Sequence, residues 1–291
     1  MSNLLNQLGM SCPIIQAPMA GTAPPKLAAA VSNAGGLGSI AVGATDLDGA
    51  VAQIQQTRAL TDCAFNVNFF CHARAQQDQG KQSDWLKRLA PEFAKFNATP
   101  PSALTEIYQS FLTDDAKFQM ILDQRPAVVS FHFGLPSTDK INALQDKGII
   151  LFSTAITLAD ALEAQAAGID AIVAQGWEAG GHRGIIAPSS ADTRLGTLAL
   201  TRILSENLFI PVIAAGGIMD GAGIRAALNM GATCAQMGTA FIDTDHSLAD
   251  AAHRTALTSD AGHHTVMTPV LAGRPARWLA NAFNRRDVDT D

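Results

Sequence analysis

Residues 174–184 (Ala-Gln-Gly-Trp-Glu-Ala-Gly-Gly-His-Arg-Gly) contain the side chains of this chain that are best suited to chemistry. Four glycines there surround Glu178, His182 and Arg183. Glycine lets backbone N–H groups approach a ligand closely, and a histidine can act as an acid or a base near neutral pH. Such a loop packs poorly, so we interpret it as functional. The simpler role for Glu178 is structural, to hold the loop through hydrogen bonds. Arg183 could either form a salt bridge or bind an anion.

Two more glycine loops follow apolar runs later in the chain. Residues 214–221 contain Gly216 and Gly217, and Gln236-Met237-Gly238-Thr239 comes soon after. In many barrels the corresponding loops bind phosphate through backbone N–H groups and a helix N-terminus. Either loop alone could be an ordinary tight turn. Together, in these places, they favour a phosphate site.

Polar residues also interrupt apolar runs earlier in the sequence. Asn66 and Asn68 share one face of a predicted strand, where asparagine is depleted, and they need partners in a heterocyclic ligand or in neighbouring backbone. His132 ends another apolar run and could be structural or catalytic. The sequence Pro18-Met19 suggests a backbone that lies against a flat ligand. There is no G-x-S-x-G motif and no Cys/His pair with zinc-ligand spacing, so proton abstraction beside a cofactor remains and no metal is expected.

A repeated order of strand and helix must position these residues. The predicted strands are mostly continuous apolar runs, as expected for strands covered on both faces. They are residues 13–19, 38–42, 64–70, 127–133, 149–154, 171–175, 211–215 and 235–241, and the clearest predicted helices are residues 25–33, 47–58, 138–147, 158–167, 197–206 and 221–230. We therefore predict an α/β fold, a (β/α)₈ TIM barrel with an inserted small helical lobe. A doubly wound open sheet is the alternative, but no G-x-G-x-x-G follows the first strand.

The spacing of the elements also predicts domain limits. Residues 1–70 and 127–262 would form the barrel. Residues 71–126, which are too long for one crossover helix, would form the inserted helical lobe, and residues 263–291 would be a C-terminal extension.

The composition narrows the class of protein. Hydrophobic residues make up 47% of the 291 and charged residues 16%, which is typical of a packed globular enzyme. The net charge is −6 and the basic residues are scattered, so a nucleic-acid partner is not expected. The N-terminus does not resemble a signal peptide, no apolar run could span a membrane, and the four cysteines lack CxxC spacing. We expect free thiols and a cytoplasmic enzyme, with a homodimer as a possible assembly.

Six segments in order resemble the nitronate monooxygenase family, formerly called 2-nitropropane dioxygenases, and its class I branch in particular. They are Pro13-Ile14-Ile15-Gln16-Ala17-Pro18-Met19, Asn66-Val67-Asn68-Phe69-Phe70, Ser130-Phe131-His132-Phe133-Gly134, and residues 175–184, 214–221 and 236–239. Gly273-Arg274-Pro275-Ala276-Arg277 resembles the tail of the family. Six ordered motifs are far more specific than any single one.

This resemblance implies a TIM barrel that binds FMN and oxidises alkyl nitronates with O₂ to carbonyl compounds and nitrite. Propionate 3-nitronate is a substrate that it suggests, and nitroalkanes would react after deprotonation. His182 would be the catalytic base, and His132, Met19 and Tyr108 would line the substrate pocket. The residues expected to hold FMN are Met19, Asn68, Gln175, Gly180, Gly216, Gly217, Gln236, Met237, Gly238 and Thr239.

Two other functions stay open at this point. An FMN-dependent NAD(P)H reductase, of the enoyl-acyl-carrier-protein or quinone type, has a similar Glu-Ser/Ala-Gly-Gly-His loop, in which the histidine would protonate rather than abstract. A non-redox barrel that binds a phosphate ligand is the third reading.

Overall fold

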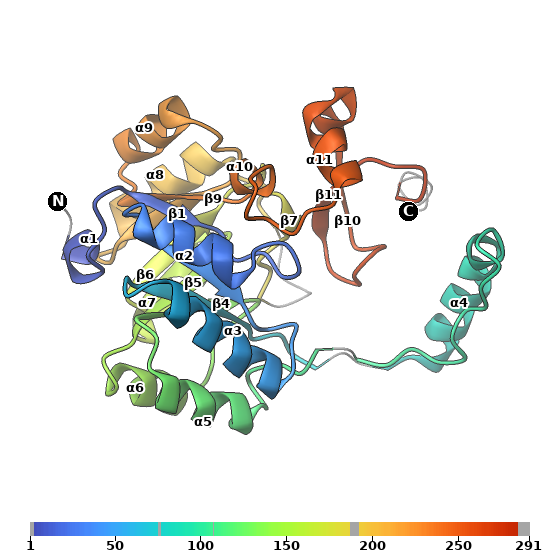
Figure 1. Cartoon of the computed structure of the whole chain (residues 1–291), viewed down its shortest axis with the longest axis horizontal. Coiled ribbons are helices and arrows are strands. Elements are labelled where there is room, and N and C mark those ends of the chain that lie inside the picture. Colours follow the sequence, from blue (N-terminus) through green and yellow to red (C-terminus); the bar gives the residue numbers. More distant parts are fainter. Residues whose placement is uncertain (1–2, 75–76, 107, 187–191, 285–291) are drawn as a thin grey trace.

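Eight parallel strands curl into a barrel in this computed structural model, which describes residues 3–74, 77–106, 108–186 and 192–284 (Figure 1). The strand order is β1-β9-β8-β6-β5-β4-β3-β2. The strands are β1 Ile14–Gln16, β2 Gly38–Ala41, β3 Phe65–Phe70, β4 Val128–His132, β5 Ile150–Ala155, β6 Ala171–Gln175, β8 Val212–Ala215 and β9 Cys234–Met237. The predicted (β/α)₈ barrel is confirmed.

The contact between β1 and β2 closes the barrel. The Gln16 amide donates to the Leu37 carbonyl at 2.9 Å, and the Leu37 amide donates to the Ile14 carbonyl at 3.0 Å. One residue pair further along β2, a side chain takes the place of the backbone acceptor: Gln16 Oε1 accepts from the Ser39 amide at 2.8 Å. Gln16 is completely buried, so this hydrogen bond satisfies a backbone donor that water cannot reach.

Helices cover the outside of the strands. They are α2 Pro25–Asn33, α3 Leu47–Leu60, α5 Asp115–Gln124, α6 Thr138–Gln145, α7 Leu158–Ala166, α8 Thr197–Asn207 and α9 Gly221–Asn229. Their apolar faces pack on outward-facing strand residues such as Val67, Phe131 and Ile172 in the largest core cluster. Several helices begin at a side-chain cap, for example Ser137, whose hydroxyl accepts from the Lys140 amide.

The last predicted strand is wrong in its second half. The prediction extended it to residue 241, but β9 ends at Met237 and a short helix, α10 (Thr239–Ile242), follows Gly238. The apolar run continues because Phe241 packs outside the barrel against Leu27 and Val31 of α2. Continuous hydrophobicity here reflects two different packing surfaces rather than one strand.

The interior of the barrel has an apolar and a polar end. Near the amino ends of the strands, Ile15, Val128 and Phe152 pack with α1 (Asn3–Gln7), whose Leu4 and Leu5 are buried beneath them. Toward the carboxyl ends, alternation along the strands places polar residues inward. These are Asn66, Asn68, Ser130, His132, Thr154 and Gln175. A ligand of mixed polarity is therefore accommodated at the carboxyl end, where barrels place their sites.

Residues 71–126 divide into two parts. Helix α5 lies against the barrel between α3 and α6 and buries Lys117, Met120 and Ile121. Helix α4 (Gln79–Ala94) stands apart from the barrel at the end of extended connections and has no buried residue (Figure 1). We therefore propose that the insertion ends before Asp115, because α5 is the barrel's own crossover helix.

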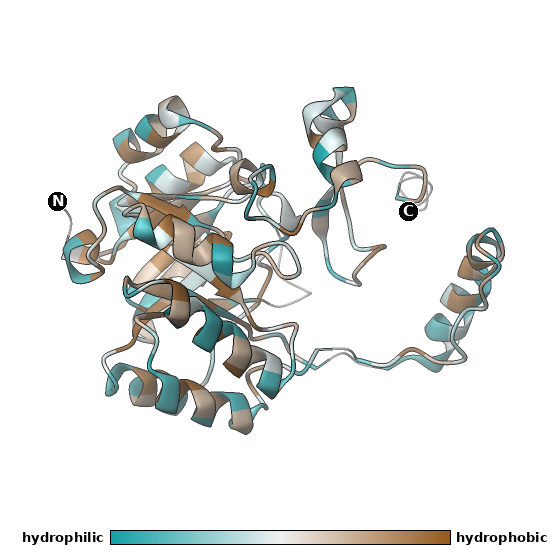
Figure 2. Cartoon of the chain, viewed as in Figure 1, coloured by the Kyte–Doolittle hydropathy of each residue, from teal (hydrophilic) through white to brown (hydrophobic). Residues whose placement is uncertain are grey.

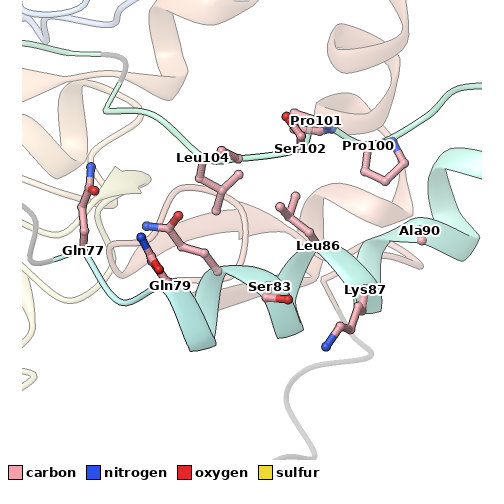
Figure 3. A pocket seen from close by; sticks show the side chains of 12 residues that line it. Gln77, Gln79, Ser83, Leu86, Lys87, Ala90, Pro100, Pro101, Ser102 and Leu104 are labelled. Carbon is pink, nitrogen blue, oxygen red and sulfur yellow. The ribbon is translucent and has the colours of Figure 1, made fainter.

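Helix α4 carries both hydrophobic and hydrophilic residues (Figure 2). A cavity lies between it and the returning segment, with Leu86 and Leu104 pointing into the space (Figure 3). Glutamine, serine, proline and alanine side chains and one lysine make up most of its lining, without a histidine or a carboxylate. This cavity thus offers neither a histidine nor a carboxylate as an acid or base, and we seek the chemistry at the barrel.

The C-terminal residues form a small second sheet. After α11 (Ala251–Thr258) and a 3₁₀ turn at Asp260–His263, strands β10 (Thr265–Thr268) and β11 (Ala276–Leu279) run antiparallel. Strand β11 also pairs with β7 (Gly181–His182), so that Ala276 lies opposite His182. The tail therefore holds the loop that sequence analysis singled out.

Three further findings concern the described residues only. None of their helices is long and apolar enough to cross a membrane. They contain no group of three or more histidine, cysteine or acidic side chains arranged to hold a metal ion. The four cysteines are free thiols. Cytoplasmic location and a homodimer stay predictions.

The closure of the barrel can be tested by replacing Gln16 with methionine. Gln16→Met keeps the side-chain volume but leaves the buried Ser39 amide without an acceptor, which costs roughly 1–3 kcal/mol of unfolding free energy. Urea denaturation measures this loss. Gln56→Met on the exposed face of α3 is the control and should change stability by less than about 0.5 kcal/mol. Equal effects of the two substitutions would contradict the role of Gln16.

Candidate active site

His182 is held on a strand and projects between two aromatic rings. Its ring lies 5.7 Å from that of Phe133 at 90° and 6.1 Å from that of Trp278 at 74°, as measured between centroids. Within the described part of the chain, no group hydrogen-bonds to either ring nitrogen of His182. The imidazole is therefore fixed in direction by packing while both nitrogens stay available to a substrate.

The surroundings of His182 keep its imidazole neutral. Partial burial lowers its pKa below the ordinary value of 6.5, and the nearby Arg274 guanidinium lowers it further. Both effects disfavour the charged form, because burial removes water and a like charge repels. Near neutral pH the ring is a free base with a lone pair on one nitrogen.

His132 supports the main chain of His182. Its Nδ1 lies 3.0 Å from Thr154 Oγ1, and its Nε2 lies 3.3 Å from the His182 carbonyl oxygen. Burial above all, followed by the proximity of His182, lowers the pKa of His132 to about 4. The ring is thus neutral, and since a carbonyl can only accept, Nε2 carries the proton and Nδ1 accepts from the threonine hydroxyl.

Gln175 supports the same carbonyl from the end of β6. Its Nε2 donates to the His182 oxygen at 2.9 Å, and its Oε1 accepts from the Gly184 amide at 2.8 Å. Gly184 has to be glycine, because a Cβ there would lie 2.6 Å from Thr154 Cγ2. Gln175 was predicted as a cofactor contact; in the structure its amide ties the loop of residues 174–184 to the barrel.

Arg183 is a buried structural residue in this site. Its guanidinium forms a two-point ion pair with Asp192, at 2.8 and 3.0 Å, and donates to the carbonyls of Gln175 and Gly176. Of the two roles left open by the sequence, the structure shows the salt bridge. Arg183 thus joins the start of the loop, at Gln175 and Gly176, to Asp192 beyond the end of the loop.

Trp177 is surrounded by cations. The guanidinium carbons of Arg183, Arg194 and Arg277 lie 5.5, 5.2 and 5.2 Å from its ring, within the range of cation–π attraction. Arg277 of β11 also donates to the Trp177 carbonyl through Nε and Nη2, at 3.2 and 2.7 Å. Trp177 thereby links the loop to the C-terminal strand, a role that the sequence did not disclose.

The glycine loops after β6, β8 and β9 come together. A Cβ added at Gly180 would lie 3.7 Å from Thr239 Oγ1, and one at Gly217 would lie 3.1 Å from Glu178 Cβ. Gly216 and Gly217 have φ values of 124° and 65°, which side chains rarely tolerate. Glu178 accepts from both the amide and the hydroxyl of Thr197, at 2.8 and 2.9 Å, and so ties the loop after β6 to the start of α8.

The remaining predicted cofactor residues lie along the same rim and inner wall. Met19 Sδ would be 3.7 Å from a Cβ at Gly238, so the loops after β1 and β9 touch. Asn68 is buried and donates to the Ser130 hydroxyl at 2.9 Å. Gln236 alternates with Met237, whose side chain packs outside the barrel with Ile218. Met237 could therefore contribute only its main chain to a ligand inside.

Tyr108 is connected to His182 through two phenylalanines. Its ring lies 6.2 Å from that of Phe70, and Phe70 lies 5.3 Å from Phe133, which contacts His182. Tyr108 is 40% exposed, so it stands at the outer edge of the site. The inserted segment thus adds its tyrosine to the row of aromatic rings that leads to His182, although its helix α4 stands away from the barrel.

Sequence reasoning missed Phe133. Its φ of 73° lies in the left-handed region, which is strained for a bulky side chain. Its ring touches His132, His182, Phe70 and the Arg274 guanidinium. Strained residues gather at functional sites, and the Gly134 that follows was the available signal of an unusual strand end.

Together, the fold and the site define a (β/α)₈ barrel with a neutral, unpaired histidine beside a glycine-lined rim. Comparison with known proteins identifies its family. The model of the nitronate monooxygenase family matches residues 2–289. A nitronate monooxygenase of Paraburkholderia phytofirmans is 54% identical over 98% of this chain and 78% of its own length, and one of Pseudomonas aeruginosa is 52% identical over 94% and 78%.

Solved structures agree with these relatives. Nitroalkane oxidase from Streptomyces ansochromogenes superimposes with a TM-score of 0.88 at 42% identity, covering 98% of this chain and 80% of that one. FabK from Thermotoga maritima gives 0.76 at 30% identity, with 98% and 76% covered. The chain belongs to the nitronate monooxygenase family and is an oxidoreductase.

The structural role of Arg183 generates a stability test. Arg183→Gln breaks a buried ion pair and leaves two carbonyls short of a donor, so it should cost about 3 kcal/mol or more of unfolding free energy. Arg202→Gln removes an exposed pair with Glu206 and should cost less than about 1 kcal/mol. Chemical denaturation compares the two variants, and a loss from Arg183→Gln no larger than the control's would refute the role.

Proposed function

We propose that this chain is an FMN-dependent nitronate monooxygenase that oxidises alkyl nitronates with O₂ to carbonyl compounds and nitrite. Propionate 3-nitronate is the proposed substrate, and nitroalkanes are used after His182 removes a proton. The observation that carries the proposal is the neutral, unpaired imidazole of His182 at the mouth of the barrel, held by His132, Gln175 and β11.

The described residues fit a flavin mononucleotide. Gly180, Gly216, Gly217, Gly238 and Thr239 come from loops that meet on the rim, and backbone N–H groups of glycine can approach a phosphate closely. On the inner wall, the buried Asn66 Oδ1 has no hydrogen-bond partner among the described residues. An unpaired buried acceptor is costly, so it supports a ligand with N–H groups inside the polar end of the barrel.

We assign the proposed contacts by position. Gly180, Gly216, Gly217, Gly238 and Thr239 would hold the phosphate, with Met237 contributing its main chain. Asn68, Gln175 and Gln236 would face the ring system from the wall, and Met19 would lie beside it. Bound FMN would supply the electron acceptor for the nitronate and the place where O₂ reacts.

The protein's own part in the reaction is to position and move a proton. One ring nitrogen of His182 takes the α-proton of a nitroalkane, which is acidic because the nitro group delocalises the resulting charge. His132 and Gln175 fix the His182 carbonyl, and Phe133 and Trp278 fix the ring. A preformed nitronate lacks that proton and does not need the base.

The second candidate is an FMN-dependent NAD(P)H reductase, which the likeness to FabK favours. Rapid bleaching of bound flavin by NADH in anaerobic solution would establish this reading. Slow or absent bleaching, together with oxygen uptake on nitronates, would establish the monooxygenase.

The purified protein is expected to be yellow and to release FMN on denaturation. With propionate 3-nitronate and no nicotinamide it should consume O₂ and form nitrite. An oxygen electrode and a nitrite assay measure both. Absence of uptake by the flavin-loaded protein would reject the proposed activity, and a colourless protein that takes up no FMN would favour a non-redox barrel.

Replacing His182 with asparagine separates the base from the rest of the site. His182→Asn should lower kcat/KM for neutral nitroethane by about 100-fold or more but affect preformed ethyl nitronate little. His253→Asn on the exposed face of α11 is the control and should change neither rate. Equal losses on the two substrates would refute a role limited to proton abstraction.

The pH dependence follows from the direction of the His182 pKa. A base works only when unprotonated, so kcat/KM for nitroethane should fall as pH drops through a pKa that lies below 6.5. From there to pH 7.5 it should be flat with respect to this group. Initial rates between pH 5 and 7.5 measure the profile, and an acid limb centred above 6.5 would contradict the depressed pKa.

A further inference from the structure

Arg274 lies beside the base without an acceptor of its own. It precedes β11 in the turn Gly273-Arg274-Pro275, and its guanidinium carbon is 4.7 Å from the centroid of the Phe133 ring. The His182 ring contacts the same phenylalanine. Because both contact Phe133, and because Arg274 also lowers the pKa of His182, the guanidinium and the imidazole lie near each other at the barrel mouth.

The other partly buried arginines near the site use their donors within the protein. Arg183 binds Asp192 and two carbonyls, and Arg277 binds the Trp177 carbonyl and Thr265. Arg274 is half-buried, yet among the described residues it has neither a hydrogen bond nor an ion pair. Burial alone lowers its pKa, with no carboxylate to offset the effect. A guanidinium that loses water normally gains an anion in return.

A second donor close by is also unpaired. The indole Nε1 of Trp278 is buried and has no partner in the part of the chain that the structure describes. Its ring packs against His182. Two donors that lack acceptors among the described residues therefore lie near the proposed base, and one of them is charged. This arrangement is suited to a bound anion.

We propose that Arg274 binds the anionic group of the substrate, a planar group with two oxygens such as a carboxylate or a nitronate. This inference rests on the proposed function, since it assigns the residue that selects the substrate of the same site. A guanidinium presents parallel N–H donors that match two oxygens of one plane. Arg274 would thus make the enzyme prefer anionic nitro compounds over neutral ones.

The main experiment compares three substrates in Arg274→Gln. Its kcat/KM should fall about 10- to 100-fold on propionate 3-nitronate, as expected when a charge-assisted hydrogen bond is lost, with little change on neutral 1-nitropropane. An equal fall on propyl 1-nitronate would identify the nitronate as the bound group, and a smaller fall there would identify the carboxylate. Arg225→Gln, an exposed arginine on α9, is the control.

Two further readouts separate binding from folding. The inhibition constant of propionate, which cannot be oxidised, should rise about 10-fold or more if the carboxylate is the bound group. The acid limb of the nitroethane profile should move to higher pH in Arg274→Gln but stay in place in Arg274→Lys, which keeps the charge without the planar fork.

The outcomes distinguish this inference from the proposed function. A wild-type enzyme active on nitronates whose Arg274→Gln variant is unchanged on both anions would overturn the role of Arg274 alone. A loss of equal size on neutral 1-nitropropane would overturn it as well, because it would show a structural role. Inactivity of the flavin-loaded wild type on every nitronate would reject the function itself.

Discussion

The carbonyl oxygen of His182 is the atom on which the geometry of the site depends. It accepts from Gln175 at the end of β6 and faces the protonated nitrogen of His132 at the end of β4. One main-chain atom is therefore fixed by two strands of the barrel. Because the ring of the same residue projects from this point, the barrel positions the imidazole that we propose as the base without touching its nitrogens. A base must be held rigidly yet have a free lone pair, and binding its backbone satisfies both conditions.

The C-terminal strand supplies the other half of this support. Ala276 pairs with His182, and the Arg183 amide donates to the Pro275 carbonyl. Arg277 reaches back to the Trp177 carbonyl about 100 residues earlier, at the other end of the loop. The loop is thus part of a three-stranded sheet rather than a free connection. Strand pairing restricts Gly181 and His182, and so removes at the proposed base the freedom that glycine provides.

The sequence predicted the strands correctly where a run of apolar residues belonged to a single element. Strands such as β3 and β6 are buried on both faces, so their apolar runs match their limits closely. The prediction failed after Met237, where Phe241 is apolar because it packs on α2 from outside. A local pattern also could not show that residues 71–126 consist of an extended helix, α4, and a barrel helix, α5. Helices α4 and α5 both combine apolar and charged residues, but only α5 packs on the barrel and buries Met120 and Ile121.

The site divides in a similar way. Glycines, His182 and Gln175 were visible because their residue types are unusual at strand ends. The roles of Trp177, Phe133 and Arg274 were invisible because each depends on contacts between distant segments, such as Arg277 with Trp177. Phe133 shows this most clearly. Its left-handed backbone conformation is unfavourable locally, but it places the ring against two histidines and one arginine. A strained residue is retained only where the surrounding structure compels it, so the strain at Phe133 is itself evidence that the position of its ring matters to the site.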